Sequence, residues 1–150
     1  MNRPKFRVWD IEEQKWYKPT YKAYMNELHD IHVDLDGGLL IRTIDDSGKS
    51  VTIHESMFEG RYELIQSTGL KDINGKDIYE GDILKVFVLC DIGPIARVIF
   101  KNGMFGIEDD MHGYGYDKGL YSLFQILSLR DAEIIGNIYE HSHLLEENAE

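Results

Sequence analysis

The sequence predicts a mainly β protein: a small SH3-like or related β-barrel or sandwich, with an N-terminal β-meander and few short helices. Short segments alternate apolar and polar residues, as in Ile31–Asp36, and this period of two is typical of half-buried strands. Glycine-bearing turns such as Gly37-Gly38 and Asn102-Gly103 separate these segments. No strand–helix–strand alternation occurs, so we expect neither a parallel sheet nor a Rossmann-type site.

The first half of the chain reads as a meander. Trp9 and Trp16 lie on the two arms of the first predicted hairpin, where they would stack across the strands. Between Pro19 and His29 we expect a short helix or a loop, because Tyr21, Tyr24, Met25 and Leu28 have helical spacing. The remaining strands expected here cover residues 31–35, 39–44, 51–54 and 62–65.

The second half is expected to form the barrel. Residues 91–94, which contain Gly93-Pro94, should end one strand, and residues 109–119 should form a surface loop. Residues 120–129 suit a short helix or a buried strand, and residues 143–147 a brief terminal helix. Its strands are expected at 82–89, 95–100, 104–108 and 133–139. The sequence thus divides into a lobe at 1–66, a barrel lobe at 67–143 and an acidic tail at 144–150.

The most densely specified stretch runs from Gln66 to Leu84. Asn74-Gly75 lies between Ile73 and Ile78, and Asn-Gly is the strongest short hairpin signal because a type I′ turn needs positive φ at both central residues. We interpret the stretch as architecture, with residues that bend and pair the chain.

Composition limits the function. The formal charge is −11, of which residues 1–70 carry −3 and residues 71–150 carry −8. General nucleic-acid binding is therefore disfavoured, since it depends on Lys and Arg contacts to phosphate. No apolar run is long enough to span a membrane, and the N-terminus lacks a signal-peptide pattern. With a single cysteine, Cys90, an internal disulfide cannot form, which favours a reducing cytoplasm.

Four sequence blocks occur in order along the chain, at residues 5–10, 68–83, 98–100 and 135–140. Together they resemble the YopX family of phage and prophage proteins. The resemblance implies a mostly β, barrel-like fold and a bacteriophage or prophage origin, but it implies no known activity. The positions that we take as the structural motif are Thr68, Gly69, Leu70, Asp72, Asn74, Gly75, Tyr79, Glu80, Gly81, Asp82, Gly136, Asn137 and Tyr139.

No pattern predicts a cofactor or a metal. Asp34-Leu35-Asp36-Gly37 lacks the first carboxylate and the closing glutamate of a calcium loop. The histidines have no cysteine pair to complete a zinc site. Asp109, Asp110 and His112 form the tightest carboxylate–imidazole cluster, but glycines surround it, so a metal-dependent hydrolase is the weakest hypothesis.

The sequence therefore favours a non-enzymatic, cytoplasmic protein-binding module that acts on a host or phage protein. The candidate binding residues are Trp9, Trp16 and Tyr17. The alternative is a nucleic-acid-binding module that uses Arg3, Lys5 and Arg7 with the two tryptophans. We also expect that such a fold can self-associate through its unpaired strand edges.

Overall fold

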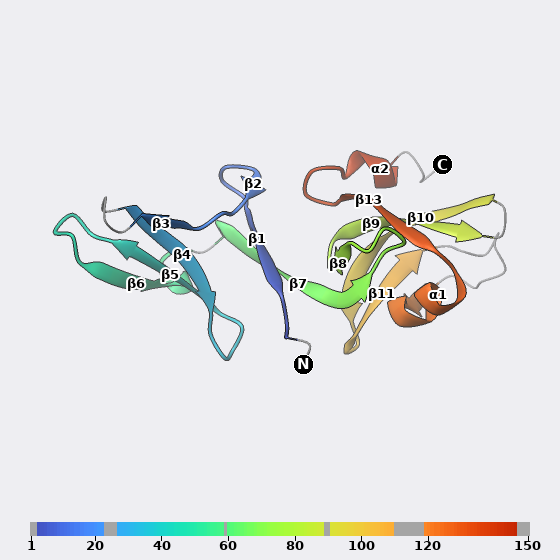
Figure 1. Ribbon diagram of the computed structural model, residues 1–150, viewed down its shortest axis with the longest axis horizontal. Coiled ribbons are helices and arrows are strands. Elements are labelled where there is room, and N and C mark those ends of the chain that lie inside the picture. The colour runs from blue at the N-terminus through green and yellow to red at the C-terminus, as the bar shows by residue number, and fades with distance from the viewer. Residues whose placement is uncertain (1–2, 23–26, 59, 89–90, 110–118, 147–150) are drawn as a thin grey trace. The chain divides into compact units, whose positions relative to one another are not determined.

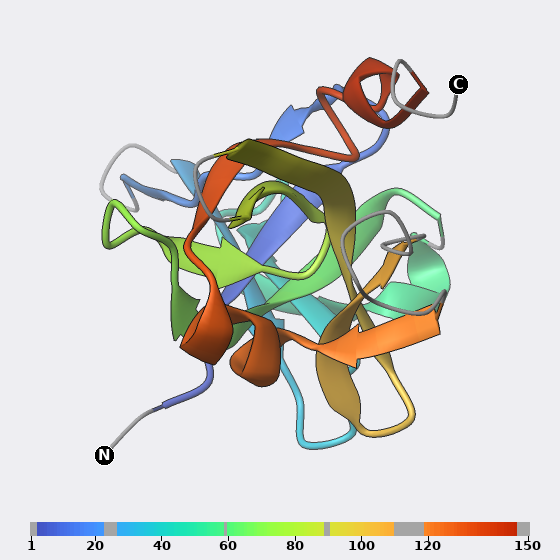
Figure 2. The ribbon, with the colours of Figure 1, turned by 90° about the vertical axis from the view of Figure 1, so that its right-hand side faces the viewer.

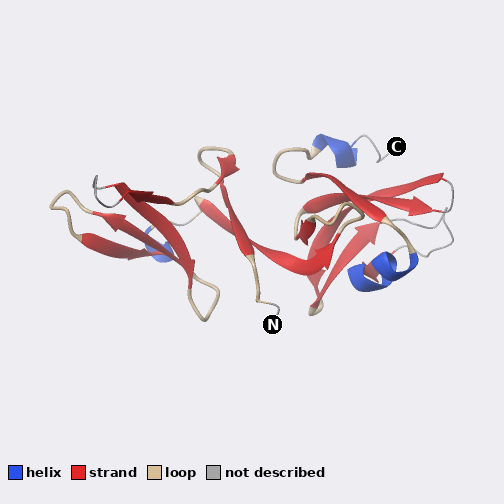
Figure 3. Cartoon of the chain, in the orientation of Figure 1, coloured by secondary structure: helices blue, strands red, loops and turns tan. Residues whose placement is uncertain are grey.

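The computed structural model describes residues 3–22, 27–58, 60–88, 91–109 and 119–146 (Figure 1). Contacts divide the chain into two compact units: Arg7–Leu64, here the N-terminal unit, and Met1–Phe6 with Ile65–Glu150, here the C-terminal unit. Strands dominate the described residues and helices are few and short (Figure 3), which confirms the mainly β prediction. The predicted lobes at 1–66 and 67–143 and the acidic tail at 144–150 stay predictions.

In the N-terminal unit, β3, β4, β5 and β6 form an antiparallel sheet in that order. Ile41 is buried at its centre, and its register partners are Ile31 and Ile53. The unit also holds a hairpin whose paired residues include Trp9 and Trp16. The element bounds are β1 Phe6–Asp10, β2 Lys15–Trp16, β3 Thr20–Lys22, β4 Glu27–Val33, β5 Leu39–Ile44, β6 Ser50–His54 and the 3-10 turn η2 Glu55–Met57.

In the C-terminal unit, the strand order is β12-β11-β10-β9-β13, and the sheet curls into half a barrel (Figure 2). Its interior is filled by apolar side chains with almost no exposure, among them Ile78, Leu84, Val98, Ile107 and Leu123. The element bounds are β7 Tyr62–Lys71, β8 Asp77–Tyr79, β9 Asp82–Val88, β10 Asp91–Lys101, β11 Met104–Asp109, β12 Gly119–Ser122, α1 Leu123–Leu129, β13 Ala132–Asn137 and α2 His143–Glu146.

β1 and β7 each contribute residues to both units. Within the N-terminal unit, the Ile11 N–H donates to the Arg61 carbonyl at 2.8 Å. Within the C-terminal unit, the Ser67 N–H donates to the Lys5 carbonyl at 2.8 Å. The short N-terminal arm thus has a backbone partner in the unit that carries the Gln66–Leu84 stretch.

The segment between Pro19 and His29 was expected to be a helix or a loop, and that expectation is wrong at both ends. β3 and β4 occupy the described parts, with Tyr21 paired to Leu28. The side chain of Tyr21 is 63% exposed, so it lies on no buried helical face. Tyr24 and Met25, which completed the helical spacing, lie outside the described residues.

The expected strand break at Gly93-Pro94 is also wrong, because β10 runs through it. The register with β9 shifts between Ile92 and Ile95, and a proline without an N–H is tolerated at such a bulge. Gly93 allows close approach of the strands, since a Cβ there would lie 2.4 Å from the Val86 carbonyl oxygen.

The two Asn-Gly pairs adopt different turns. Asn102 and Gly103 both have positive φ (55° and 77°), and Lys101 pairs with Met104, as in a two-residue type I′ hairpin. At Asn74-Gly75 only the glycine has positive φ (78°), so the type I′ prediction is wrong there.

Asn74-Gly75 belongs instead to a loop type that occurs three times in the described part of the chain. Asp34, Asp45 and Asp72 each accept, through Oδ1, the backbone N–H groups two and four residues later, at 2.7–2.9 Å. In each loop the glycine three residues after the aspartate has a φ near +80° and donates its N–H to the aspartate carbonyl. The shared pattern is Asp-x-[Asp/Ser/Asn]-Gly, an Asx-type turn.

Candidate functional site

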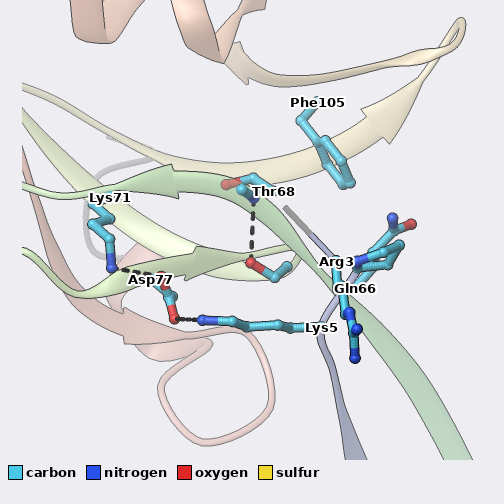
Figure 4. Close-up of a pocket in the computed structure, with 10 residues that line it drawn as sticks. Arg3, Lys5, Gln66, Thr68, Lys71, Asp77 and Phe105 are labelled. Atoms are coloured by element: carbon cyan, nitrogen blue, oxygen red, sulfur yellow. Dashed lines mark hydrogen bonds and ion pairs between the residues drawn. The ribbon is translucent and has the colours of Figure 1, made fainter. Parts of the chain in front are cut away.

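A half-open groove lies in the C-terminal unit beside the bulged part of β7 (Figure 4). Its volume is about 470 Å³. We call it the basic groove, because three cationic side chains and one carboxylate line it. The lining residues are Arg3, Pro4, Lys5, Gln66, Ser67, Thr68, Gly69, Lys71, Asp77 and Phe105.

Asp77 holds two of the cations in place. The Lys5 Nζ lies 3.1 Å from Asp77 Oδ2, and the Lys71 Nζ lies 3.0 Å from Asp77 Oδ1. The hydrogen bonds from Lys71 and Lys5 lower the pKa of the Asp77 carboxyl. Among the described residues Arg3 forms no ion pair. The groove therefore keeps a surplus of positive charge in a chain of formal charge −11.

A β-bulge shapes the floor of the groove. The pairing of β7 with β8 shifts register between Ser67 and Lys71, and Gly69 there has a φ of 78°. The Ser67 and Thr68 hydroxyl oxygens accept the N–H groups two residues later, at 3.2 and 3.1 Å. Ser67 and the motif residues Thr68 and Gly69 thus contribute two hydroxyls and a bent backbone to the lining of the groove.

An aromatic pair stands at one side of the groove. Phe105 on β11 is the register partner of Phe100 on β10, and their ring centroids are 4.8 Å apart. Phe105 lines the groove, and Phe100 is 51% exposed. Figure 4 shows the Phe105 ring across the groove from the Lys5–Asp77–Lys71 cluster.

Asp72 of the motif is a structural centre rather than a groove residue. It is 7% exposed, and its Oδ2 accepts the Ile134 N–H from β13 at 3.1 Å in addition to the two turn bonds. Burial opposes its ionisation, but the N–H donors of Ile134, Lys76 and Asn74 outweigh burial and lower its pKa. This carboxylate ties the turn to the sheet.

The remaining motif residues join the central block to the C-terminal block. The Ile138 N–H donates to the Gly81 carbonyl at 2.8 Å, and a Cβ on Gly81 would lie 3.1 Å from the Tyr139 ring. Asn137 Oδ1 accepts the N–H groups of Tyr139 and Glu140. These contacts hold the block at residues 68–83 against the block at residues 135–140, although the two lie far apart in sequence.

The same motif positions also fix the start of β9. Asp82 Oδ2 accepts the Tyr79 N–H at 2.8 Å, and the Glu80 N–H donates to the Gln66 carbonyl at 3.0 Å. Leu70 packs against the core cluster of the unit. A Cβ on Gly136 would lie 2.8 Å from the His141 ring.

Of the three candidate binding residues in the N-terminal unit, Trp9 is 4% exposed. Its ring packs edge-on against Trp16, with centroids 4.9 Å apart, which confirms the predicted cross-strand contact. The Arg7 guanidinium lies 4.0 Å from the centroid of the half-buried Trp16 ring. Trp9 is thus buried, whereas the half-buried Trp16 is covered on one face by the cation–π contact with Arg7.

Tyr17 belongs to a different cluster, because successive residues of an extended chain point to opposite faces. Its hydroxyl lies 2.6 Å from His29 Nδ1, and its ring centroid lies 5.8 Å from that of Tyr62. The ring centroids of Phe58 and Tyr62 are 5.7 Å apart. Burial raises the pKa of the Tyr17 hydroxyl, and burial also lowers the pKa of His29, so both are neutral near pH 7.

This second cluster borders a hollow of about 280 Å³ in the N-terminal unit. We call it the aromatic hollow. Its lining combines the rings of Phe58 and Tyr62 with a buried Leu39 and polar groups of η2. The lining residues are Leu39, His54, Glu55, Ser56, Phe58, Gly60 and Tyr62.

The structure thus separates Trp9 and Trp16 from Tyr17, and it adds residues that sequence reasoning did not select. Phe58 and Tyr62 lie on either side of Gly60. Residues 58–62 show no regular alternation of apolar and polar residues, so the sequence offers no reason to select them. Lys71 lies far from Arg3 and Lys5 in sequence, and the backbone bond from Ser67 on β7 to the Lys5 carbonyl places the N-terminal arm beside this strand.

Within the described ranges, no group of three or more His, Cys, Asp or Glu side chains is placed to hold a metal ion. Asp110 and His112 of the hydrolase hypothesis, and Cys90, lie outside the described residues. No helix in the described part of the chain is long and apolar enough to cross a membrane.

Comparisons with known proteins agree with the blocks quoted above. The family model for the YopX protein matches residues 5–146, so the chain belongs to the YopX family. The fold is similar to protein YopX from Bacillus subtilis (TM-score 0.59, 18% identity, 96% of this chain and 98% of that one). It is also similar to protein EF1440 from Enterococcus faecalis (TM-score 0.51, 25% identity, 95% and 98%). A search of curated proteins gives no match.

Proposed function

We propose that this protein is a non-enzymatic protein-binding module of a phage or prophage, which acts on a host or phage protein in the bacterial cytoplasm. The observation that carries the proposal is the aromatic hollow of the N-terminal unit. The phage origin rests on the family resemblance, and the single cysteine supports the cytoplasmic location.

The hollow has the composition of an interface hot spot. Binding energy in protein interfaces concentrates in Trp, Tyr and Arg side chains around pockets that exclude water. Here Tyr62 is flanked by Tyr17 and Phe58, and the Arg61 guanidinium lies 5.0 Å from the Tyr62 ring centroid. Met57, which precedes Phe58 in the sequence, is 78% exposed and adds apolar surface to this segment.

The hollow suits an apolar anchor side chain from the partner. Its volume of about 280 Å³ accommodates one large side chain, and buried Leu39 provides an apolar contact. The Glu55 carboxylate accepts the Leu39 N–H at 3.0 Å, which fixes this side chain at the wall of the hollow. These residues support the binding of an apolar side chain.

Affinity capture from lysate of the bacterium that carries the gene tests this proposal. Immobilised wild-type protein should retain one partner reproducibly, and Tyr17→Ala and Phe58→Ala should each lower its recovery about tenfold or more. Trp16→Ala should lower it much less, because Trp16 packs in the separate tryptophan pair. Tyr21→Ala is the matched control, since Tyr21 is an exposed aromatic of the same unit that lines neither cluster.

Circular dichroism should show that all four variants are folded. No partner above background, or equal recovery by Tyr17→Ala and the wild type, would contradict the proposal. Sedimentation of the purified protein distinguishes a second copy of the chain from a different partner, because self-association would appear without lysate.

A further inference from the structure

We propose that the basic groove of the C-terminal unit binds a nucleoside phosphate, either free or as part of a single-stranded nucleic acid. This inference does not depend on the protein-binding proposal, since all its residues lie in the other unit. Its basis is that the groove combines cations, hydroxyls and an aromatic face within one concavity.

The cationic end of the groove suits a phosphate group. Lys5 and Lys71 each donate one N–H to Asp77, and an ammonium group has three N–H donors. Two donors on each lysine thus remain for phosphate oxygens. Arg3, which forms no ion pair among the described residues, adds a planar guanidinium of the kind that binds phosphate with two parallel hydrogen bonds.

The neutral residues next to these cations extend the same chemistry. Ser67 and Thr68 accept backbone N–H groups through their oxygens, so each hydroxyl proton is left to donate to a phosphate or sugar oxygen. The Gln66 side-chain amide makes no hydrogen bond within the described residues and has both a donor and an acceptor for a base edge.

The aromatic side of the groove suits a nucleobase. Phe105 faces the groove, and Phe100 supports its ring from the neighbouring strand at 4.8 Å. A positively charged groove with a stacking ring is how proteins bind single-stranded nucleic acid without reading its sequence. The volume of about 470 Å³ lies within the range of small-ligand pockets and matches one nucleotide better than a long strand.

The net charge of −11 does not oppose this site. Screening limits the reach of distant carboxylates to about 10 Å at ordinary salt, so the local surplus of cations governs a phosphate in the groove. The sequence argument against nucleic acids therefore applies to broad, non-specific binding and not to a single pocket.

Calorimetric titration of the full chain tests the inference with three probes: AMP, a fluorescein-labelled dT8 oligonucleotide and inorganic phosphate. We expect saturable binding of AMP or dT8 at 50 mM salt. Lys71→Gln should weaken it about tenfold, whereas Lys76→Gln, an exposed lysine outside the groove, should not.

Phe105→Leu keeps apolar packing but removes the ring, so it should weaken AMP or dT8 about tenfold and leave phosphate unchanged. Phe124→Leu is the aromatic control, because Phe124 is exposed and lies outside the groove. If the ligand is a strand, dT8 should bind more tightly than AMP and lose roughly twentyfold in affinity between 50 and 200 mM salt. If it is a free nucleotide, AMP should bind at least as well.

The inference is overturned if neither AMP nor dT8 binds saturably. It is also overturned if Lys71→Gln and Phe105→Leu bind both probes like the wild type. Equal binding of inorganic phosphate and AMP would remove the nucleoside from the proposal. A failure of these titrations leaves the captured protein partner untouched, and the reverse holds too, because the two tests use different residues and different ligands.

Discussion

Asp72 shows how much of this fold depends on one carboxylate. Asp34 and Asp45 form the same turn, but only Asp72 is also bonded to a strand far along the chain, through the Ile134 N–H. Three N–H groups would lose their acceptor in Asp72→Ala, and hydrogen bonds to a charged group are worth roughly 1.5–3 kcal/mol each before partial replacement by water. Among the motif residues, Asp72 therefore has the clearest structural role.

We predict that Asp72→Ala lowers the free energy of unfolding by about 3 kcal/mol, a large part of the 5–15 kcal/mol typical of a domain. Urea denaturation followed by circular dichroism measures it. Asp45→Ala is the matched control, since Asp45 is exposed and its bonds stay within its own turn. Equal losses in the two variants would show that the bond to Ile134 contributes nothing.

Asp30 gives a prediction about pH. This carboxylate is 1% exposed and lies 2.7 Å from Arg42 Nη2 and 3.2 Å from His32 Nε2. Burial opposes its ionisation, but the hydrogen bond from Arg42 and the charge of His32 outweigh burial and lower its pKa below 3.8. Its contribution to stability is thus present above pH 3.8 and is lost as the pH falls through the lowered pKa.

Arg42→Gln should therefore move acid unfolding of the N-terminal unit to higher pH, because burial alone raises the pKa of a carboxyl group. Both tryptophans of the chain lie in this unit, so their fluorescence against pH reports the transition. Lys49→Gln removes a cation that forms no ion pair among the described residues, and its midpoint should match the wild type. Coinciding midpoints for the two variants would refute the role assigned to Arg42.

At the scale of elements, local turn chemistry decided which predictions held. Alternation and glycine-bearing turns predicted the strands around β4, β5 and β6, and the structure has them. The same signals could not predict the register shift that carries β10 through Pro94, because it depends on the neighbouring β9. The short helix or loop expected around Tyr21 is wrong, because spacing alone cannot distinguish a short helix from an exposed hairpin.

The two Asn-Gly turns make this point testable. Asn102 has a φ of 55°, a backbone conformation that costs alanine about 1 kcal/mol. The φ of Asn74 is not positive, so alanine carries no such cost there. Asn102→Ala should therefore lower the free energy of unfolding by about 1 kcal/mol, and Asn74→Ala by much less. Thermal unfolding of both variants checks the difference, and an equal or reversed effect would contradict the turn assignment.

At the scale of the whole molecule, the sequence predicted the family and the class of fold, but only part of the candidate site. Trp16 and Tyr17 were selected as neighbours, yet they face different clusters, because extended chains alternate their side chains. Lys71 and Phe105 reach the basic groove only through strand pairing between segments far apart in sequence. Sites assembled in this way require the three-dimensional structure.

The central claim is that a partner protein binds at the aromatic hollow. Site-specific photocrosslinking tests this claim most directly, because it detects a protein in contact with a chosen residue. A benzophenone amino acid replaces Phe58 in one sample and exposed Tyr21 in another, and both are irradiated in the producing bacterium. We predict one discrete adduct from position 58, which excess wild-type protein suppresses, and none from position 21. The claim is contradicted if position 58 yields no adduct, or if both positions yield the same one.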